Sequence, residues 1–357
     1  MKKRIALLLA AVLAVGTLTT ACGGGNNAAK VKVGLGAHVQ LDYSTKDADA
    51  TAEEGKQDGK TQADLHVAAV TIDADGKIVA VDVDSIQMSA TFAPDGSVVK
   101  GTEQAFKTKK ELGNDYNMKN TSASIGVIEG GAEWFEQVAA FEKYVVGKTA
   151  DQVNALLGSD GYTTDDTLKA GCTIKVNGLV NAVVRACEDA AANTVEVAAT
   201  DKLALGLVGE MAKAEFKADA EDATKAGASQ AYANFVAVTS ADGKITACVL
   251  DSVQANFNWD ATGKVTSDLS KEPTTKYDLK EGYGMKNASA GKGVIEGGAE
   301  WFEQADAFMK FVNGMTADQV AGIATDDAGY VQDETLKAGC TMKISAYQTA
   351  VAKALAK

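Results

Sequence analysis

Two threonines, Thr173 and Thr341, end two copies of one seven-residue string, TLKAGCT. The copies cover residues 167–173 and 335–341. A threonine side chain carries an alcohol, which can act as a nucleophile and form an ester bond. Most surface positions differ between the two regions, whereas the string does not. The two threonines are therefore candidate sites of covalent attachment.

The residues before each threonine suit the attachment of a bulky group. Gly171 and Gly339 can adopt backbone angles that push the following residues outward. Cys172 and Cys340 have small side chains that leave space beside the alcohol. We include these four residues in the two candidate sites.

The sequence offers no conventional catalytic constellation. The copies share no histidine, no nucleophile elbow and no phosphate-binding loop, and residues 73–76 (DADG) lack the spacing of a calcium loop. Matching acids do occur, Glu129 with Glu296 and Glu133 with Glu300. Acids at the start of a helix usually interact with its dipole, and we interpret them in that way.

A block of identical residues shows that the chain contains one unit twice. GVIEGGAEWFEQ occupies residues 126–137 and returns at 293–304, an offset of 167. Such a repeat predicts two tandem domains, 31–187 and 203–357. Between them, 188–202 is predicted to be a linker with a short strand in TVEVA.

Each repeat mixes strands with helices. Apolar and polar residues alternate on both sides of Asp75-Gly76 and of Asp242-Gly243, which predicts two β-hairpins. Apolar residues then recur at helical spacing in two stripes, led by Trp134 and Trp301, which we interpret as core residues. Strands precede helices in both repeats, so we expect an α+β fold.

Several helix starts are also predicted. Capping boxes open a short helix in each repeat, at Thr149 with Gln152 and at Thr316 with Gln319. A last helix is expected to follow the repeated string, with Asn177 and Ser345 as its caps.

The N-terminal residues resemble an export signal. Basic residues at 2–4 precede an apolar run at 5–18, which is too short to cross a membrane comfortably. This pattern predicts a signal peptide over 1–21, and its LTTAC ending resembles a bacterial lipobox. Cys22 would then carry the lipid, and 22–30 would be a flexible tether. We expect the remaining chain to lie outside the cytoplasm, anchored to the membrane.

The charge of the chain narrows the range of partners. Without residues 1–21, 32 of the 35 Lys and Arg residues remain against 48 Asp and Glu residues, a net charge of −16. This excess of acid argues against nucleic acid and anionic lipid as partners.

The cysteines and histidines do not suggest a metal site. No CxxC pair occurs, and the chain has two histidines, so a zinc or haem site is not expected. A disulfide between Cys172 and Cys340 remains open at this stage. His66 has no counterpart in the second repeat and is assigned no role.

The AGCT string resembles the Ser-Gly-Ala-Thr motif of FMN-binding domains, whose threonine is esterified to the FMN phosphate by a flavin transferase. Such domains occur in sodium-pumping quinone reductases and Rnf complexes. Two of them behind a lipoprotein signal, together with the GAEWFEQ block, resemble the extracellular electron-transfer flavin lipoproteins of Gram-positive bacteria. In this chain the motif reads Ala-Gly-Cys-Thr in both copies.

The resemblance implies one covalent FMN on Thr173 and another on Thr341. It implies an electron carrier with no substrate of its own, modified by an FMN transferase. A membrane quinol-oxidising chain would donate electrons, and extracellular acceptors would receive them. Lys175 or Lys343, and the start of the following helix, would lie near the phosphate.

Two alternatives stay open. One is a cofactor-free surface lipoprotein that captures a small ligand between its two domains. The other is a flavinylated subunit of an extracellular reductase complex, with the substrate site on another chain.

Overall fold

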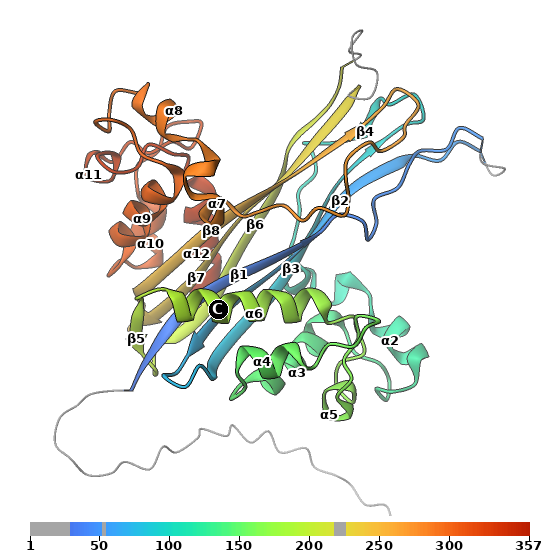
Figure 1. Ribbon diagram of the computed structural model, residues 1–357, viewed down its shortest axis with the longest axis horizontal. Helices are drawn as coiled ribbons and strands as arrows, with labels where there is room; N and C mark the ends of the chain where they lie inside the picture. The colour runs from blue at the N-terminus through green and yellow to red at the C-terminus, as the bar shows by residue number, and fades with distance from the viewer. Residues whose placement is uncertain (1–28, 52–54, 218–225) are drawn as a thin grey trace, which may run out of the picture.

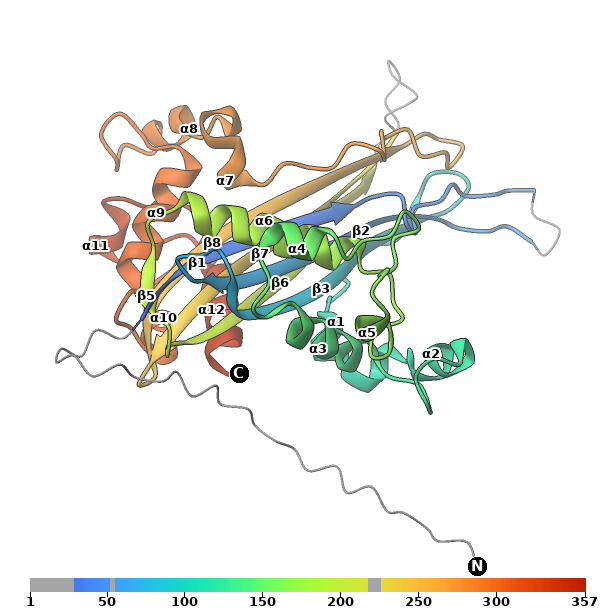
Figure 2. The same cartoon turned by 60° about the horizontal axis from the view of Figure 1, so that its bottom comes forward.

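The computed structural model describes residues 29–51, 55–217 and 226–357 (Figures 1 and 2). The expected signal peptide 1–21, Cys22 and the tether up to residue 28 lie outside this range. Within the described residues the fold is mixed α+β, with antiparallel sheets and short helices, as the sequence predicted. None of the helices in this range is long and apolar enough to cross a membrane.

The first repeat forms a five-stranded sheet with its helices on one face. The strand order is β4-β3-β2-β1-β5, and neighbouring strands are antiparallel. The strands are β1 (Lys30–Gln40), β2 (Gly59–Ile72), β3 (Ile78–Phe92), β4 (Val98–Lys100) and β5 (Glu196–Ala198). The helices are α1 (Lys109–Leu112), η1 (Gly113–Tyr116), α2 (Lys119–Ile125), α3 (Trp134–Val145), α4 (Ala150–Asn154), α5 (Asp166–Lys169) and α6 (Asn177–Ala192).

The second repeat forms a three-stranded sheet in the order β6-β7-β8. Its strands are β6 (Lys202–Phe216), β7 (Gly227–Ala241) and β8 (Lys244–Trp259). Its helices are α7 (Lys276–Leu279), η3 (Lys280–Tyr283), α8 (Lys286–Ala290), α9 (Trp301–Val312), α10 (Ala317–Ala321), α11 (Glu334–Lys337) and α12 (Ser345–Leu355).

Both expected hairpins are present. The β7–β8 turn is tight, and its residues Asp242 and Gly243 both have positive φ angles, 51° and 75°. Two such residues are what the turn of a two-residue hairpin requires. The β2–β3 turn is longer, and the backbone N–H groups of Asp75 and Lys77 both donate to the Asp73 carboxylate.

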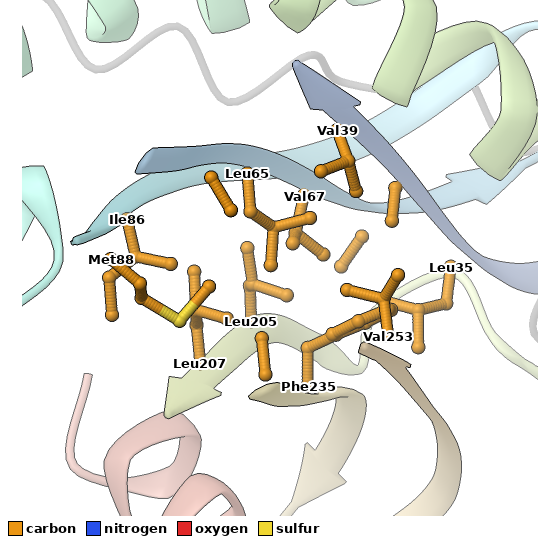
Figure 3. Packing of buried hydrophobic residues seen from close by; sticks show 14 of the residues in the cluster. Leu35, Val39, Leu65, Val67, Ile86, Met88, Leu205, Leu207, Phe235 and Val253 are labelled. Carbon is orange, nitrogen blue, oxygen red and sulfur yellow. The ribbon is translucent and has the colours of Figure 1, made fainter. Parts of the chain in front are cut away.

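The two sheets pack face to face and share one hydrophobic core (Figure 3). Leu65 and Ile86 from the first sheet lie in the same buried cluster as Leu205 and Phe235 from the second. The repeats therefore do not have wholly separate cores, although each also builds a core of its own beneath its helices. The order of the layers is helices, sheet, sheet, helices.

The long helices α6 and α12 lie close to the outer faces of the sheets because glycines face them. A Cβ added at Gly36 would lie 2.3 Å from the Ala186 nitrogen, and one at Gly206 would lie 1.9 Å from the Ala350 oxygen. Only glycine allows the two backbones to approach so closely.

Carboxylates cap several backbone groups along the sheet edges. The N–H groups of Leu35 and Val39 on β1 donate to Asp189 and Glu272, at 3.0 and 2.9 Å. The Leu205 N–H on β6 donates in the same way to Asp82 of β3, at 2.8 Å. Capped edges cannot pair with a further strand, which protects the sheets from edge-to-edge association.

Residues 188–202 are integrated into the fold. Helix α6 extends to Ala192, and the expected strand in TVEVA is present as β5, which pairs with β1. The following residues lead directly into β6, which begins at Lys202.

The predicted helix starts are confirmed, but two of the predicted caps are wrong. Both capping boxes are formed, at Thr149 and Thr316. Helices α6 and α12 begin at Asn177 and Ser345, but the capping role predicted for these residues is wrong. The cap positions are one residue earlier, at Val176 and Ile344, and neither makes a side-chain cap.

Candidate functional site

Thr173 lies in the short segment between α5 and α6, where Gln137 of α3 holds it. The Gln137 side-chain oxygen accepts hydrogen bonds from the Thr173 backbone N–H, at 2.8 Å, and from the Thr173 hydroxyl, at 3.1 Å. The Gln137 amide nitrogen donates to the Ala132 carbonyl at 3.0 Å, which fixes which way the amide faces. Gln137 thus orients the Thr173 hydroxyl. Because the hydroxyl is the donor in this hydrogen bond, the lone pairs of the Thr173 oxygen remain available.

The second repeat reproduces this arrangement. Gln304 of α9 accepts from the Thr341 N–H and hydroxyl at 2.8 and 3.1 Å, and donates to the Ala299 carbonyl at 3.0 Å. Both threonines are largely buried, at 7% and 4% exposure. The two predicted attachment residues therefore have the same local geometry.

In the first repeat, Thr173 lines a pocket of about 270 Å³. The walls come from β2, from η1 and α2, from α3 and from the start of α6. Aromatic and aliphatic side chains provide much of the lining, and Tyr43, Ile125 and Tyr162 are exposed at 61%, 51% and 41%. A pocket with apolar walls and a few polar groups is typical of small-molecule and cofactor sites.

A lysine lies among the aromatic rings of this pocket. The Lys109 ammonium is 4.9 Å from the centre of the Tyr116 ring and 5.3 Å from that of Trp134. The two rings meet edge to face, with centres 6.3 Å apart. Burial lowers the pKa of Lys109, while nearby Asp64 acts in the opposite direction. The pocket wall therefore carries a cation supported by cation–π contacts.

Asp64 and His66 of β2 form another wall of the pocket. The side-chain amides of Gln62 and Gln87 donate to the two oxygens of Asp64, at 2.9 and 2.5 Å. His66 Nδ1 lies 2.7 Å from the Ser85 hydroxyl. Burial, together with the Lys109 charge, lowers the pKa of His66 well below its usual value, so this imidazole is neutral at pH 7.

Glycine has a packing role at both predicted sites. Neither Gly171 nor Gly339 has a positive φ angle, so the expectation that these residues turn the chain through special backbone angles is wrong. A Cβ at Gly171 would lie 3.0 Å from the Ala140 Cβ, and one at Gly339 equally close to that of Ala307. The glycines allow the segment to pack tightly against α3 or α9.

Cys172 and Cys340 are buried thiols. Burial raises their pKa values to about 12 and about 11. Among the described residues Cys172, Cys187, Cys248 and Cys340 are all free, so the disulfide left open between Cys172 and Cys340 is not formed. A protonated thiol in an apolar setting is inert, which fits a small packing residue.

A helix-start role was expected for both pairs of matching acids, and one pair has it, whereas Glu129 and Glu296 lie in turns outside the helices. Glu133 and Glu300 are the N-caps of α3 and α9, in capping boxes with Glu136 and Glu303. Their carboxylates also accept the backbone N–H of Met118, at 2.8 Å, and of Met285, at 2.7 Å. These contacts tie the start of the helix to the segment that forms the pocket rim.

Sequence reasoning missed several residues of the two sites. Gln137 and Gln304 lie inside the block that repeats letter for letter, and their shared polarity in an apolar stripe was the available signal. Lys109 and Lys276 also match at the offset of 167. His66 was set aside for want of a counterpart, yet it lines the pocket. Trp134 is both buried core and pocket wall.

No family model, curated protein or solved structure matches the chain.

Proposed function

We propose that this protein is a cell-surface electron carrier with one FMN joined covalently to Thr173 and one to Thr341. The observation that carries the proposal is the position of Thr173. Thr173, whose hydroxyl is oriented by Gln137, lines a pocket with aromatic walls and a buried cation. Each half would be an FMN-binding domain, of the kind whose Ser-Gly-Ala-Thr motif the AGCT string resembles.

The attachment step asks little of the protein itself. The Thr173 oxygen forms the new bond to phosphorus as the phosphoanhydride bond of an activated FMN donor breaks, and the remaining part of the donor leaves as a phosphate that takes the bonding electron pair. The hydroxyl proton is lost to the modifying transferase. Gln137 accepts the hydroxyl hydrogen bond and so holds the oxygen in one orientation before the transfer.

The pocket residues fit a flat aromatic ring carried on a phosphate. Trp134 and Tyr116 offer ring faces and edges, and Met118 and Leu179 offer aliphatic surface. Lys175 and Asn177, at the start of α6, line the same pocket and favour a phosphate near the helix N-terminus.

When bound, the isoalloxazine ring of FMN supplies the ability to accept and release electrons. The chain places the Lys109 charge at the wall of the pocket, and a cation beside a ring favours the uptake of negative charge. His66 stays neutral and keeps a hydrogen bond to Ser85. Neither group needs to react for the carrier to work.

The partners in this proposal follow from the sequence resemblance. A lipid on Cys22 would hold the protein at the outer face of the membrane. A quinol-oxidising membrane chain would supply electrons, and extracellular acceptors would remove them. The flexible tether expected over residues 22–30 would let both partners be reached.

The proposal is tested by producing the protein with and without an FMN transferase. Denaturing gel fluorescence and intact mass should show two flavins per chain in the first case and none in the second. Thr173→Ala and Thr341→Ala should each remove one flavin, and the double variant both. Colourless protein from the modifying host would overturn the proposal.

A specific observation also favours the cofactor-free binding protein. A second pocket, of about 1090 Å³, lies between the repeats, with walls from β1, α6, β8, α7 and α9. Arg185 and Glu272 form a two-pronged ion pair there, at 2.6 and 2.8 Å. Because the other charged residues of the wall are mostly acidic, this alternative predicts a small cationic ligand that binds whether or not flavin is present.

A further inference from the structure

The two threonine sites share their anchor but not the space beside it. The β-sheet register places Asp64 and Tyr232 at equivalent positions, opposite Gln87 and Gln254. It likewise matches His66 with Asn234, opposite Ser85 and Ser252. At the helix that follows, Leu179 corresponds to Tyr347 by the offset of 168.

Tyr347 occupies the interior of the second site. It is 1% exposed, and its ring packs beside that of Phe308 with centres 6.0 Å apart. Its hydroxyl is hydrogen-bonded to Ser252, which in turn donates to the Asn234 side-chain oxygen at 2.7 Å. A tyrosine fixed in this way fills volume that a leucine leaves open.

Tyr232 closes the same space from the sheet. Its hydroxyl accepts a hydrogen bond from Lys276 at 3.0 Å, and the lysine ammonium lies 4.5 Å from the centre of its ring. A smaller pocket of about 220 Å³ remains beside Tyr232 and Asn234, and Thr341 is not among its described lining residues. The residual space is therefore separate from the attachment residue.

A lysine side chain also lies on the solvent side of the second site. The Lys292 ammonium donates to the Thr341 carbonyl at 2.8 Å and lies 4.3 Å from the centre of the Tyr330 ring. At the equivalent positions of the first site, Ile125 and Tyr162 are exposed rim residues of the pocket. Tyr330 is as exposed as Tyr162, at 40% against 41%, so the difference lies at the other position, where the second site carries a cation next to the position of a phosphate and the first carries Ile125.

We propose that the two sites are unequal: the first encloses its attached group, whereas the second holds its group on the surface. This inference rests on the proposed function, because it concerns groups attached at Thr173 and Thr341. At Thr341, Tyr232 and Tyr347 exclude a ring from the interior, and Lys292 pairs with the phosphate. The surface group is then the one that meets soluble partners.

Quenching of flavin fluorescence tests the inequality. Flavinylated Thr341→Ala carries only the group on Thr173, and flavinylated Thr173→Ala only the group on Thr341. Acrylamide is the quencher of choice, because the net charge of −13 would repel iodide. We expect the quenching constant of the Thr341-linked flavin to be severalfold larger, and its fluorescence yield to be higher because Trp134 and Tyr116 do not contact it.

Equal constants, or a larger constant at Thr173, would overturn the inequality and leave the proposed function intact. Absence of flavin from both variants and from the parent protein would overturn both. Tyr347→Leu in the Thr173→Ala background provides a second measurement. It opens space beside Thr341 and should lower the constant, and an unchanged constant in a folded variant would contradict the assigned role of Tyr347.

Discussion

At the residue scale, a single glutamine in each half orients the threonine hydroxyl that we propose as the point of attachment. Gln137 is fully buried, and its side-chain oxygen is the acceptor for both the N–H and the hydroxyl of Thr173. A buried donor that loses its acceptor costs about 1–3 kcal/mol. The glutamine therefore contributes to stability as well as to the orientation of the Thr173 hydroxyl.

We predict that Gln137→Met lowers the free energy of unfolding by about 1–3 kcal/mol and reduces flavin attachment at Thr173. Methionine keeps the volume but lacks the acceptor. Urea denaturation and peptide mass measure the two effects, and Gln304→Met is the matched control that should affect Thr341 alone. Full flavin content at Thr173 in the Gln137→Met protein would contradict the positioning role.

Asp251, in the second repeat, makes the free energy of unfolding depend on pH. Burial raises its pKa to about 7 from an ordinary value of 3.8, although its Oδ1 accepts N–H groups of Ser252 and Tyr277 at 2.7 and 2.9 Å. Because the pKa is higher in the folded state than in the unfolded state, protonation of Asp251 favours folding. This contribution of Asp251 to the free energy of unfolding is complete below about pH 4. It is lost as the pH rises to about 7.

Asp251→Asn should therefore remove this pH dependence. An asparagine oxygen keeps both backbone hydrogen bonds and does not ionise. Between pH 4 and pH 7 the parent protein should lose up to about 1.4 kcal/mol per pH unit relative to the variant. Burial lowers the pKa of the neighbouring Lys276 to about 8, so its titration lies above this window. Parallel stability curves for the two proteins would contradict the assignment.

At the element scale, the outer helices depend on glycines in the strands beneath them. Helix α12 approaches β6 so closely that a side chain at Gly206 would overlap the Ala350 carbonyl. The same helix carries Tyr347, and it begins at Ser345, close in the chain to Thr341. The position of the helix therefore determines how the second site is filled.

We predict that Gly206→Ala destabilises the protein by at least about 1–3 kcal/mol, the usual cost of overpacking. Gly282→Ala is the control, because a Cβ there meets nothing within 4 Å. The midpoint of urea unfolding measures both. Similar midpoints for the two variants would show that α12 does not pack as described.

At the scale of the whole molecule, the two repeats are joined by a common core. Phe235 and Leu205 of the second sheet lie against Leu65 and Ile86 of the first (Figure 3). Polar contacts add to this junction, including the ion pair of Lys357 with Asp82 at 2.8 Å. Two sequence copies have thus become one packed body with two separate site regions.

This shared core predicts one cooperative unfolding transition. Phe235→Ala removes a fully buried ring and should cost about 3–5 kcal/mol, lowering the single transition seen by calorimetry. Val99→Ala, at a half-exposed position, should change little. Two transitions, one of them unmoved by Phe235→Ala, would contradict a common core.

Much of the local structure was predictable, because the spacing of apolar residues and the repeated blocks depend on residues close together in the sequence. The hairpins follow from the alternation of apolar and polar residues, and the helices that begin at Trp134 and Trp301 follow from helical spacing. The starts of α6 and α12 were predicted from Asn177 and Ser345, which are the first residues of these helices but not their caps. The packing of one sheet on the other was not predictable. The sequence pattern of a strand shows that a valine is buried, but it does not show whether a helix or a second sheet covers that valine. The pocket escaped notice because Lys109 and His66 are distant from Thr173 in the sequence and meet only in the fold.

The central claim concerns two alcohols, and peptide mapping tests it most directly. Trypsin should release AGCTIK, residues 170–175, and AGCTMK, residues 338–343. The protein is to be isolated from the cell envelope of the organism that produces it. We predict that each peptide then carries the added mass of one FMN, localised to its threonine. Recovery of both peptides without any added mass would contradict the account.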